Sequence, residues 1–195
     1  LEIFLKQRLA TNLLIEDFML LANRRVAEHF YKLSRAKNRD ALFVYRIHDV
    51  PNQEKIEELQ VFLHAVGFSL KVTGGMVSGQ EINRLFKEIE GKPEENLIKT
   101  ATIRSMAKAV YSTKNIGHFG LAFRYYTHFT SPIRRYPDMM VHRILKKHLG
   151  EDTEISNEEI ARYEELAIHS SQREAAAVEA EREAIKYKQV EFLQH

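Results

Sequence analysis

Cysteine is absent from the 195 residues of this chain, which excludes a disulfide framework and any metal site built on thiolates. No apolar run approaches the roughly 18–20 residues of a membrane-spanning helix, and no signal-peptide pattern opens the chain. Apolar residues make up 44% of the sequence and charged residues 29%, as in an ordinary globular protein with a sizeable core. We therefore expect a cytoplasmic protein without membrane contact, built as one domain or one domain with an appendage.

An initiating methionine is also absent. The chain starts at Leu1, inside what the pattern predicts as the entry to a strand or helix, and residues 190–193 resemble the start of another element. We expect a piece of a longer protein, with proteolysis or disordered termini as the alternative.

The charges are unevenly distributed, although the net charge is only +2. Residues 114–150 hold seven Lys or Arg and one acidic residue, whereas residues 151–195 hold twelve acidic and five basic residues. A basic region beside an acidic one suits binding of a polyanion on one face. The alternative for the acidic stretch is a solvated helix.

The first helical pattern covers residues 11–34, with Thr11 or Asn12 as a possible cap. At 100° per residue, one face collects six apolar side chains that we expect in the core: Ile15, Phe18, Met19, Ala22, Val26 and Phe30. Glu16 and Asn23 lie together at the edge of this face. Burying an unpaired carboxylate is costly, so Glu16 has either a function or a structural partner.

The remaining patterns alternate between short strands and helices. Capping boxes pair Ser78 with Glu81 and Ser156 with Glu159, and Gly150 suits a helix C-terminus. Together they predict a helix-rich α+β fold with a few short strands. The expected strands are residues 41–48, 68–72, 118–123 and 125–130, and the expected helices are residues 52–66, 81–90, 93–111, 137–150 and 156–188.

Residues 118–143 form the most unusual stretch, with four arginines, three histidines, three tyrosines and a single acidic residue, Asp138. Ser131 followed by proline is a helix-entry signal. Arginine is electrostatically unfavourable in a first helical turn, so Arg134 and Arg135 are predicted to partner an anion. Pro137 interrupts the hydrogen-bond ladder, so we expect a short turn and then a fresh helix.

Aromatic rings interleave with these cations at Tyr125, Tyr126, His128 and Tyr136. Rings between cations are typical of sites that hold single-stranded nucleic acid by stacking and phosphate neutralisation. The alternative is that the rings pack in a core hairpin and the arginines bind carboxylates of neighbouring elements. A metal site on the histidines is disfavoured by their spacing, and a Ser131 nucleophile by the lack of a G-x-S-x-G pattern.

Residues 118–121, 126–138 and 142–143 closely resemble, at fixed spacing, the signature of the RNB exoribonucleases, the family of ribonuclease II and ribonuclease R. Residues 15–23, 42–48 and 103–111 extend the likeness, which is nearest to ribonuclease R. The resemblance implies a partial RNB catalytic domain: its C-terminal half over residues 1–190, then, at 191–195, the start of a linker to an OB-type RNA-binding barrel outside this chain.

The resemblance further implies a processive 3′-to-5′ hydrolysis of RNA to nucleoside 5′-monophosphates with Mg²⁺. By position, Arg134 matches the family arginine at the reaction centre, Arg135 is the adjacent candidate, and Glu16 matches an acidic residue that positions the terminal nucleotide. The RNA 3′ end would be the ligand of a channel lined by these residues: Asn23, His118, Tyr126, His128, Thr130, Ser131, Tyr136 and Arg143.

The family's Mg²⁺ ligands are a cluster of aspartates, and the five aspartates here are scattered at positions 17, 40, 49, 138 and 152. We therefore expect the ligands to lie in the other half of the catalytic domain, Asp138 to cap or pair with an arginine, and this chain alone to be inactive. Two alternatives remain: a stand-alone RNA-binding module derived from the nuclease fold, and a helical interaction domain whose basic strip pairs with its own acidic tail.

Overall fold

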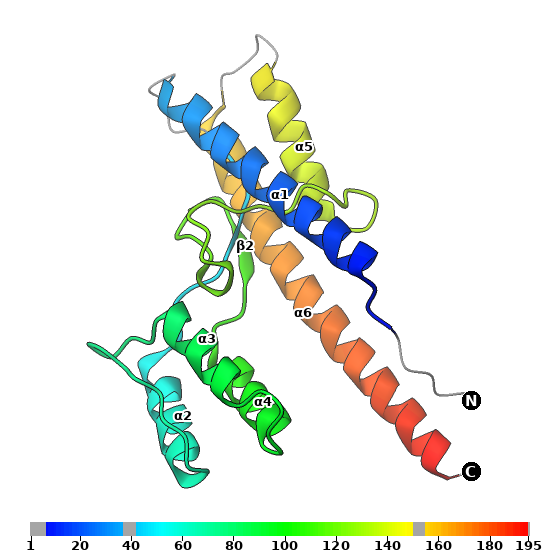
Figure 1. Ribbon diagram of the computed structural model, residues 1–195. Helices are drawn as coiled ribbons and strands as arrows, with labels where there is room; N and C mark the ends of the chain where they lie inside the picture. Colours follow the sequence, from blue (N-terminus) through cyan, green and yellow to red (C-terminus); the bar gives the residue numbers. More distant parts are fainter. Residues whose placement is uncertain (1–6, 37–41, 150–154, 195) are drawn as a thin grey trace. The chain divides into compact units, whose positions relative to one another are not determined.

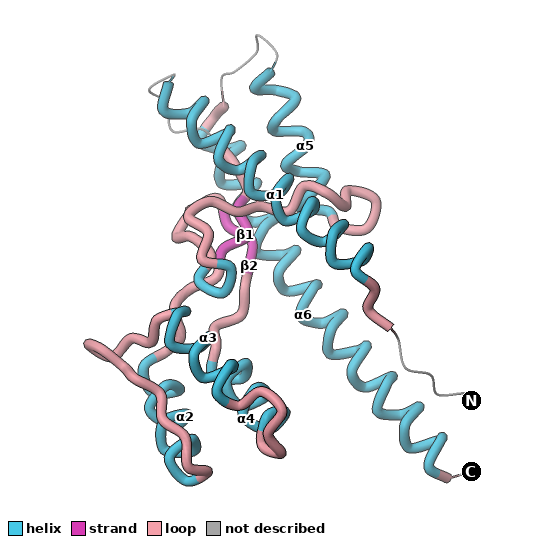
Figure 2. The backbone as a smooth tube through the Cα atoms, in the orientation of Figure 1, coloured by secondary structure: helices cyan, strands magenta, loops and turns pink. Residues whose placement is uncertain are grey.

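The computed structural model describes residues 7–36, 42–149 and 155–194. Most of these residues are helical and the only sheet among them is the pair of short strands β1 and β2, which confirms the helix-rich α+β prediction (Figures 1 and 2). The elements in chain order are α1 (Ala10–Ala36), β1 (Tyr45–Ile47), α2 (Gln53–Ala65), α3 (Gly79–Glu88), α4 (Glu95–Ser105), β2 (Val110–Ser112), the 3₁₀ helix η1 (Phe119–Leu121), α5 (Tyr136–Leu149) and α6 (Asn157–Leu193).

The chain divides into two compact units. The first unit comprises Leu1–Arg46, Val110–Asn115 and Tyr125–His195, and so contains α1, β2, α5 and α6. The second comprises Ile47–Ala109 and Ile116–Arg124, with α2, α3, α4 and η1.

Aromatic packing joins α1 and α5 in the first unit. Phe30 of α1 is fully buried, stacks on Phe43 with ring centroids 4.2 Å apart, and meets the edge of His148 on α5 at 4.6 Å. Such ring pairs add to the stabilisation that burial alone provides.

Polar contacts fasten the long helix α6 to the two strands. The Ser171 hydroxyl accepts a hydrogen bond from the backbone N–H of Tyr111 at 2.9 Å. Glu174 receives two hydrogen bonds from the Arg46 guanidinium, at 2.6 and 3.2 Å, and that guanidinium also lies 4.5 Å from the centre of the Tyr111 ring. The charge of Arg46 is therefore both paired and stacked, which suits its largely buried side chain.

The second unit has its own hydrophobic core, made where α2, α3 and α4 meet the segment between α2 and α3. Predicted helix starts are confirmed at Asn52, whose side chain accepts from Glu54 N, and at Ser78, whose hydroxyl accepts from Glu81 N at 3.2 Å. The same holds in the first unit, where Ser156 accepts from Glu159 N at 3.1 Å. The buried core residues are Ile56, Leu59, Leu63, Phe68, Leu70, Val77, Leu85, Ile89 and Ile98.

The prediction of a strand over residues 68–72 is wrong, although Phe68 and Leu70 do alternate into the core. Helix side chains, rather than a neighbouring strand, bond the backbone of this segment at Leu70 and Lys71. Gln60 donates to the Leu70 carbonyl at 2.9 Å, and the Glu81 carboxylate accepts from Lys71 N at 2.9 Å.

One other predicted helix end and two other predicted strands are also wrong. The helix expected over 93–111 ends at Ser105, because Met106 is extended and Tyr111 belongs to β2. Within residues 118–123 only Phe119–Leu121 is regular, as η1, and backbone hydrogen bonds between His118 and Phe123 close the segment; residues 125–130 form a loop.

The predicted core face of α1 is wrong in the first half of the helix. Ile15 and Phe18 are 58% and 59% exposed, and the buried residues are instead Asn23, Ala27 and Phe30. Hydrophobic periodicity placed the buried side too far round the helix, because an amide that bonds a distant loop cannot be recognised from the local pattern.

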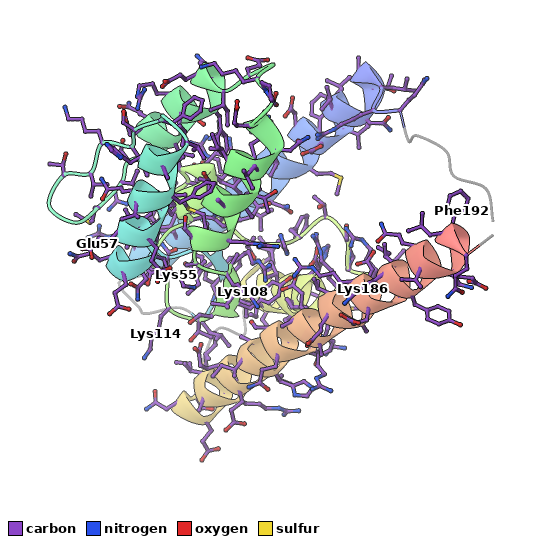
Figure 3. All side chains as sticks on the ribbon, turned by 90° about the horizontal axis from the view of Figure 1, so that it is seen from below. Lys55, Glu57, Lys108, Lys114, Lys186 and Phe192 are labelled. Carbon is purple, nitrogen blue, oxygen red and sulfur yellow. The ribbon has the colours of Figure 1, made fainter. Side chains whose placement is uncertain are left out.

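The C-terminal half of α6 is exposed, with Lys186 and Phe192 projecting from it (Figure 3). Helix α6 continues through Leu193 and therefore runs past residue 190, where the catalytic-domain half was expected to end. Gly150 lies outside the described residues. In the part of the chain that the structure describes, no helix is sufficiently long and apolar to cross a bilayer.

Candidate RNA-binding site

Three side chains from two helices hold the backbone of residues 129–131, which we call the strap. The first is Asn23 of α1, which is 3% exposed. Its Oδ1 accepts hydrogen bonds from Phe129 N at 2.9 Å and Thr130 N at 3.2 Å, and its Nδ2 donates to the Tyr126 hydroxyl at 3.2 Å. A buried amide with both ends paired fixes the strap against α1.

The second side chain is His142 of α5, whose Nε2 lies 2.8 Å from the Phe129 carbonyl oxygen. A carbonyl only accepts, so Nε2 carries the proton and donates. The imidazole also stacks on the Phe129 ring at 4.0 Å with an interplanar angle of 7°. His142 therefore holds both the backbone and the side chain of Phe129.

The third side chain is Asp138, in the first turn of α5 and 0% exposed. One oxygen accepts from Ser131 N at 2.7 Å and from Arg135 Nη2 at 2.8 Å, and the other accepts from Arg135 Nε at 2.8 Å. The sequence-based expectation that Asp138 caps or pairs with an arginine is confirmed. The carboxylate that Arg135 binds thus lies in the same stretch, three residues later, and not in a neighbouring element as the structural alternative expected.

Arg134 differs from its neighbour. It is exposed, and its guanidinium makes no hydrogen bond or ion pair with any residue in the described ranges 7–36, 42–149 and 155–194. Its backbone is nevertheless fixed, because Arg134 N and Arg135 N both donate to the Ser131 carbonyl, at 3.3 and 3.1 Å. The predicted short turn before a fresh helix is confirmed, and the turn presents on a fixed backbone a cation that has no partner within those ranges.

The aromatic residues before the strap are held from within the first unit. Tyr126 is 4% exposed and meets the His128 ring edge-on at 5.7 Å. Nδ1 of His128 lies 2.8 Å from the hydroxyl of Tyr111, and burial raises the pKa of Tyr111 to about 12. Thr130 Oγ1 is buried and is the one such side-chain polar atom without a hydrogen-bond partner in the described part of the chain.

The other predicted RNA contacts are distributed over three places. Tyr136 is 49% exposed, and Arg143, seven residues later and so on the same side of α5, is also exposed. Ser131 is partly exposed in the strap. His118 lies in the second unit, where it caps η1 by accepting from Leu121 N at 3.2 Å.

Glu16 lies on the first half of α1, where its carboxylate forms an exposed ion pair with Arg8. It falls on the same side of α1 as Asn23, one heptad earlier. The Glu16 carboxylate thus has an ion-pair partner, which is the structural role that the sequence left open for it. The catalytic role of Glu16 stays a prediction.

A magnesium site does not fit the residues that the structure describes. Nowhere among them do three metal-ligating side chains come together. Both oxygens of Asp138 already accept hydrogen bonds from Arg135 or Ser131. The expectation that Mg²⁺ ligands lie outside this chain stays a prediction.

Sequence reasoning did not identify His142 as a strap residue, having considered it for metal binding and as part of the family signature. The available signal was its position four residues after Asp138, which places both side chains on one side of α5. It also did not anticipate that Asn23 is central to the buried side of α1. Nothing local marks that role, since Asn23 bonds residues more than a hundred positions away.

Comparison with known proteins gives a consistent result. A family model described as the RNB domain matches residues 1–151. Ribonuclease R of Aquifex aeolicus is 41% identical over 188 residues, which cover 96% of this chain and 26% of that protein. The chain thus spans about a quarter of the length of the curated relatives it matches.

Solved structures show the same similarity. Mycoplasma genitalium RNase R in complex with ribose-methylated single-stranded RNA aligns with a TM-score of 0.75 and 29% identity, over 89% of this chain and 27% of that one. The same protein in complex with double-stranded RNA aligns with a TM-score of 0.78 and 28% identity, over 91% of this chain and 31% of that one. Yeast Ssd1, a pseudonuclease, shares the fold with a TM-score of 0.65 and 22% identity, over 86% of this chain and 20% of that one.

Proposed function

This chain belongs to the RNB-domain family, and we propose that it forms part of a processive 3′-to-5′ exoribonuclease of the ribonuclease R type, which hydrolyses RNA to nucleoside 5′-monophosphates. Its contribution would be the arginine side of the active site and part of the RNA channel. A pseudonuclease shares the fold, so the fold alone does not indicate nuclease activity. The evidence for that activity has to come from a particular residue.

The observation that carries the proposal is the exposed guanidinium of Arg134, which lies on a fixed turn and has no hydrogen-bond or ion-pair partner among the residues that the structure describes. Arginine binds phosphate oxygens in a bidentate manner, and a positioned cation stabilises negative charge that develops on a phosphate during hydrolysis. Arg135 has both its Nε and Nη2 bonded to a buried carboxylate, so it is the weaker candidate for the scissile phosphate. The RNase R homologue from M. genitalium has been solved with bound RNA, which supports RNA as the ligand.

The other predicted residues divide by exposure in this proposal. Tyr136 and Arg143 would contact the RNA directly from the exposed side of α5, and Glu16 would position the terminal nucleotide. Asn23 and Tyr126 are buried, so they would shape the channel by holding the strap, not by touching RNA.

The remaining parts of the enzyme would come from outside the described residues. We propose that Mg²⁺ is held by aspartates in the other half of the catalytic domain, where it would activate water. OB-type barrels of the same protein would guide the 3′ end of single-stranded RNA toward the site, and the enzyme would work in the cytoplasm.

The test is Arg134→Ala in the complete protein. We expect kcat for release of mononucleotides to fall at least about 100-fold, the range for loss of one charge-stabilising group, while the Kd for RNA changes less than about threefold. Arg162→Ala, an exposed arginine of α6, is the matched control and should leave both values unchanged. Equal losses in kcat and in affinity would make Arg134 an ordinary phosphate contact.

Two measurements separate this proposal from a stand-alone RNA-binding module. Salt-dependent RNA binding by a complete protein that releases no nucleotides would support the module instead. Robust Mg²⁺-dependent release of mononucleotides by the isolated 195-residue chain would contradict the proposal that the metal ligands lie elsewhere.

A further inference from the structure

The carboxylate of Asp138 is an unusual group to find at 0% exposure. A buried carboxylate is strongly unfavourable unless it is paired and hydrogen-bonded, and this one accepts three hydrogen bonds of 2.7–2.8 Å. Its location in the first turn of α5, next to the positive end of the helix dipole, stabilises the charge further. The site is therefore built around a fixed, ionised carboxylate.

This carboxylate holds both ends of the turn that carries Arg134. At the start of the turn it accepts from the backbone of Ser131, and at the end it binds the side chain of Arg135. Within the turn, Arg134 N and Arg135 N donate to the Ser131 carbonyl. Arg134 thus lies between Ser131 and Arg135, which are both hydrogen-bonded to the Asp138 carboxylate.

The two arginines are consequently in different states, although they are adjacent in sequence. Arg135 has a side chain that is 18% exposed and bound through Nε and Nη2. Arg134 is exposed, and its guanidinium has no partner within the described ranges. One cation is used inside the protein and the other is presented to solvent.

We propose that Asp138 and Arg135 are positioning residues for Arg134, and that Arg135 does not itself contact the reacting phosphate. Their pair sets the backbone of the turn so that the Arg134 guanidinium meets the phosphate at the RNA 3′ end in one orientation. This inference rests on the proposed function, since it assigns Arg134 to that phosphate. Misplacement of a catalytic group by as little as about 1 Å lowers the rate by up to about 100-fold, so such a pair has a large effect without touching RNA.

The experiment is a double-mutant cycle in the complete protein between Arg134→Ala and Asp138→Asn. Asparagine keeps the shape of the aspartate but removes the charge and one of the acceptors that Arg135 uses. We expect Asp138→Asn alone to lower kcat at least about tenfold with a KM for RNA within about threefold of wild type. In the Arg134→Ala background the same change should lower kcat by less than about twofold, because the residue through which it acts is gone.

Two outcomes would overturn the inference. Losses that multiply in the double variant would mean that Asp138 acts independently of Arg134, while the proposed function stands. Wild-type turnover of Arg134→Ala would remove both the inference and the role proposed for Arg134.

Arg135→Lys is a second variant, used in the same cycle if Asp138→Asn does not fold. Lysine keeps the charge next to Asp138 but cannot supply two parallel N–H donors. We expect a fall in kcat of at least about fivefold that disappears in the Arg134→Ala background. A fall in RNA affinity with unchanged kcat would instead show that Arg135 contacts RNA itself, which would overturn the inference.

Discussion

Asn23→Leu should loosen the strap and destabilise the first unit, because Asn23 is the only α1 side chain bonded to residues 129–131 among the described contacts. Leucine has the same number and branching of side-chain heavy atoms and is no smaller than asparagine, so the change removes hydrogen bonds without creating a cavity. The wild-type amide makes three such bonds, to Phe129 N, Thr130 N and the Tyr126 hydroxyl.

The magnitude follows from those bonds. Each contributes about 0.5–1.5 kcal/mol net, and a buried donor left without an acceptor costs about 1–3 kcal/mol. Leucine would leave two backbone N–H groups in that state, so we expect a loss of about 3–5 kcal/mol. Against a typical stability of about 5–15 kcal/mol, that is a large fraction.

Amide hydrogen exchange across residues 126–135 is the assay, because it reports local opening in a protein of any size. Exchange at Phe129 and Thr130 should accelerate by about two orders of magnitude or more, at about 1.4 kcal/mol for each factor of ten. Arg25→Leu is the matched control on the same helix, since among the described residues Arg25 forms only an exposed ion pair with Glu28. This change should shift stability by no more than about 0.5 kcal/mol. Unchanged exchange in Asn23→Leu would refute the argument that Asn23 holds the strap.

Two predictions concern the second unit. Hydrogen bonds from Arg84 and from the Lys71 backbone lower the pKa of Glu81 from 4.5 to about 2. The stabilisation of the folded state by the Glu81 carboxylate is therefore fully present above pH 4.5 and is lost as the pH falls toward 2. Thermal unfolding of Glu81→Gln should therefore show a lowered Tm at pH 7 and a difference from wild type that vanishes near pH 2; a constant difference would contradict this. Leu85→Ala, at a fully buried position, should cost about 2–5 kcal/mol in urea unfolding, whereas Leu97→Ala, at a position 55% exposed, should cost less than about 0.5 kcal/mol; equal costs would mean that the second unit lacks an independent core.

Sequence alone was a reliable guide wherever the responsible contacts span only a few residues. The starts of α3 and α6 followed from Ser78 and Ser156, because a capping side chain bonds an N–H a few positions away. The predicted start of α2 at Asn52 is likewise a cap in the structure. The partnership of Asp138 with an arginine was predictable for the same reason, since Arg135 lies three positions before it.

Predictions were wrong where the partner lies far away in the chain. Residues 68–72 and 125–130 have strand-like patterns, but helix side chains bond their backbones at Leu70, Lys71 and Phe129. A strand residue bonds residues 125–130 at Tyr126, whose carbonyl accepts from Arg46 N at 3.0 Å. The buried side of α1 was misplaced for the same reason, since its determining contact joins Asn23 to the distant strap.

The sequence by itself determined the family, the helix-rich class and the position of two adjacent arginines at the start of a helix, because fixed-spacing motifs and local capping depend on residues close together in the chain. Only the tertiary structure decided between the two arginines. A buried carboxylate binds Arg135 and closes the turn, and Arg134 is left exposed and unpaired within the described ranges. The physical reason is that spacing determines which residues share a turn, whereas burial determines which of their charges must be neutralised inside the protein.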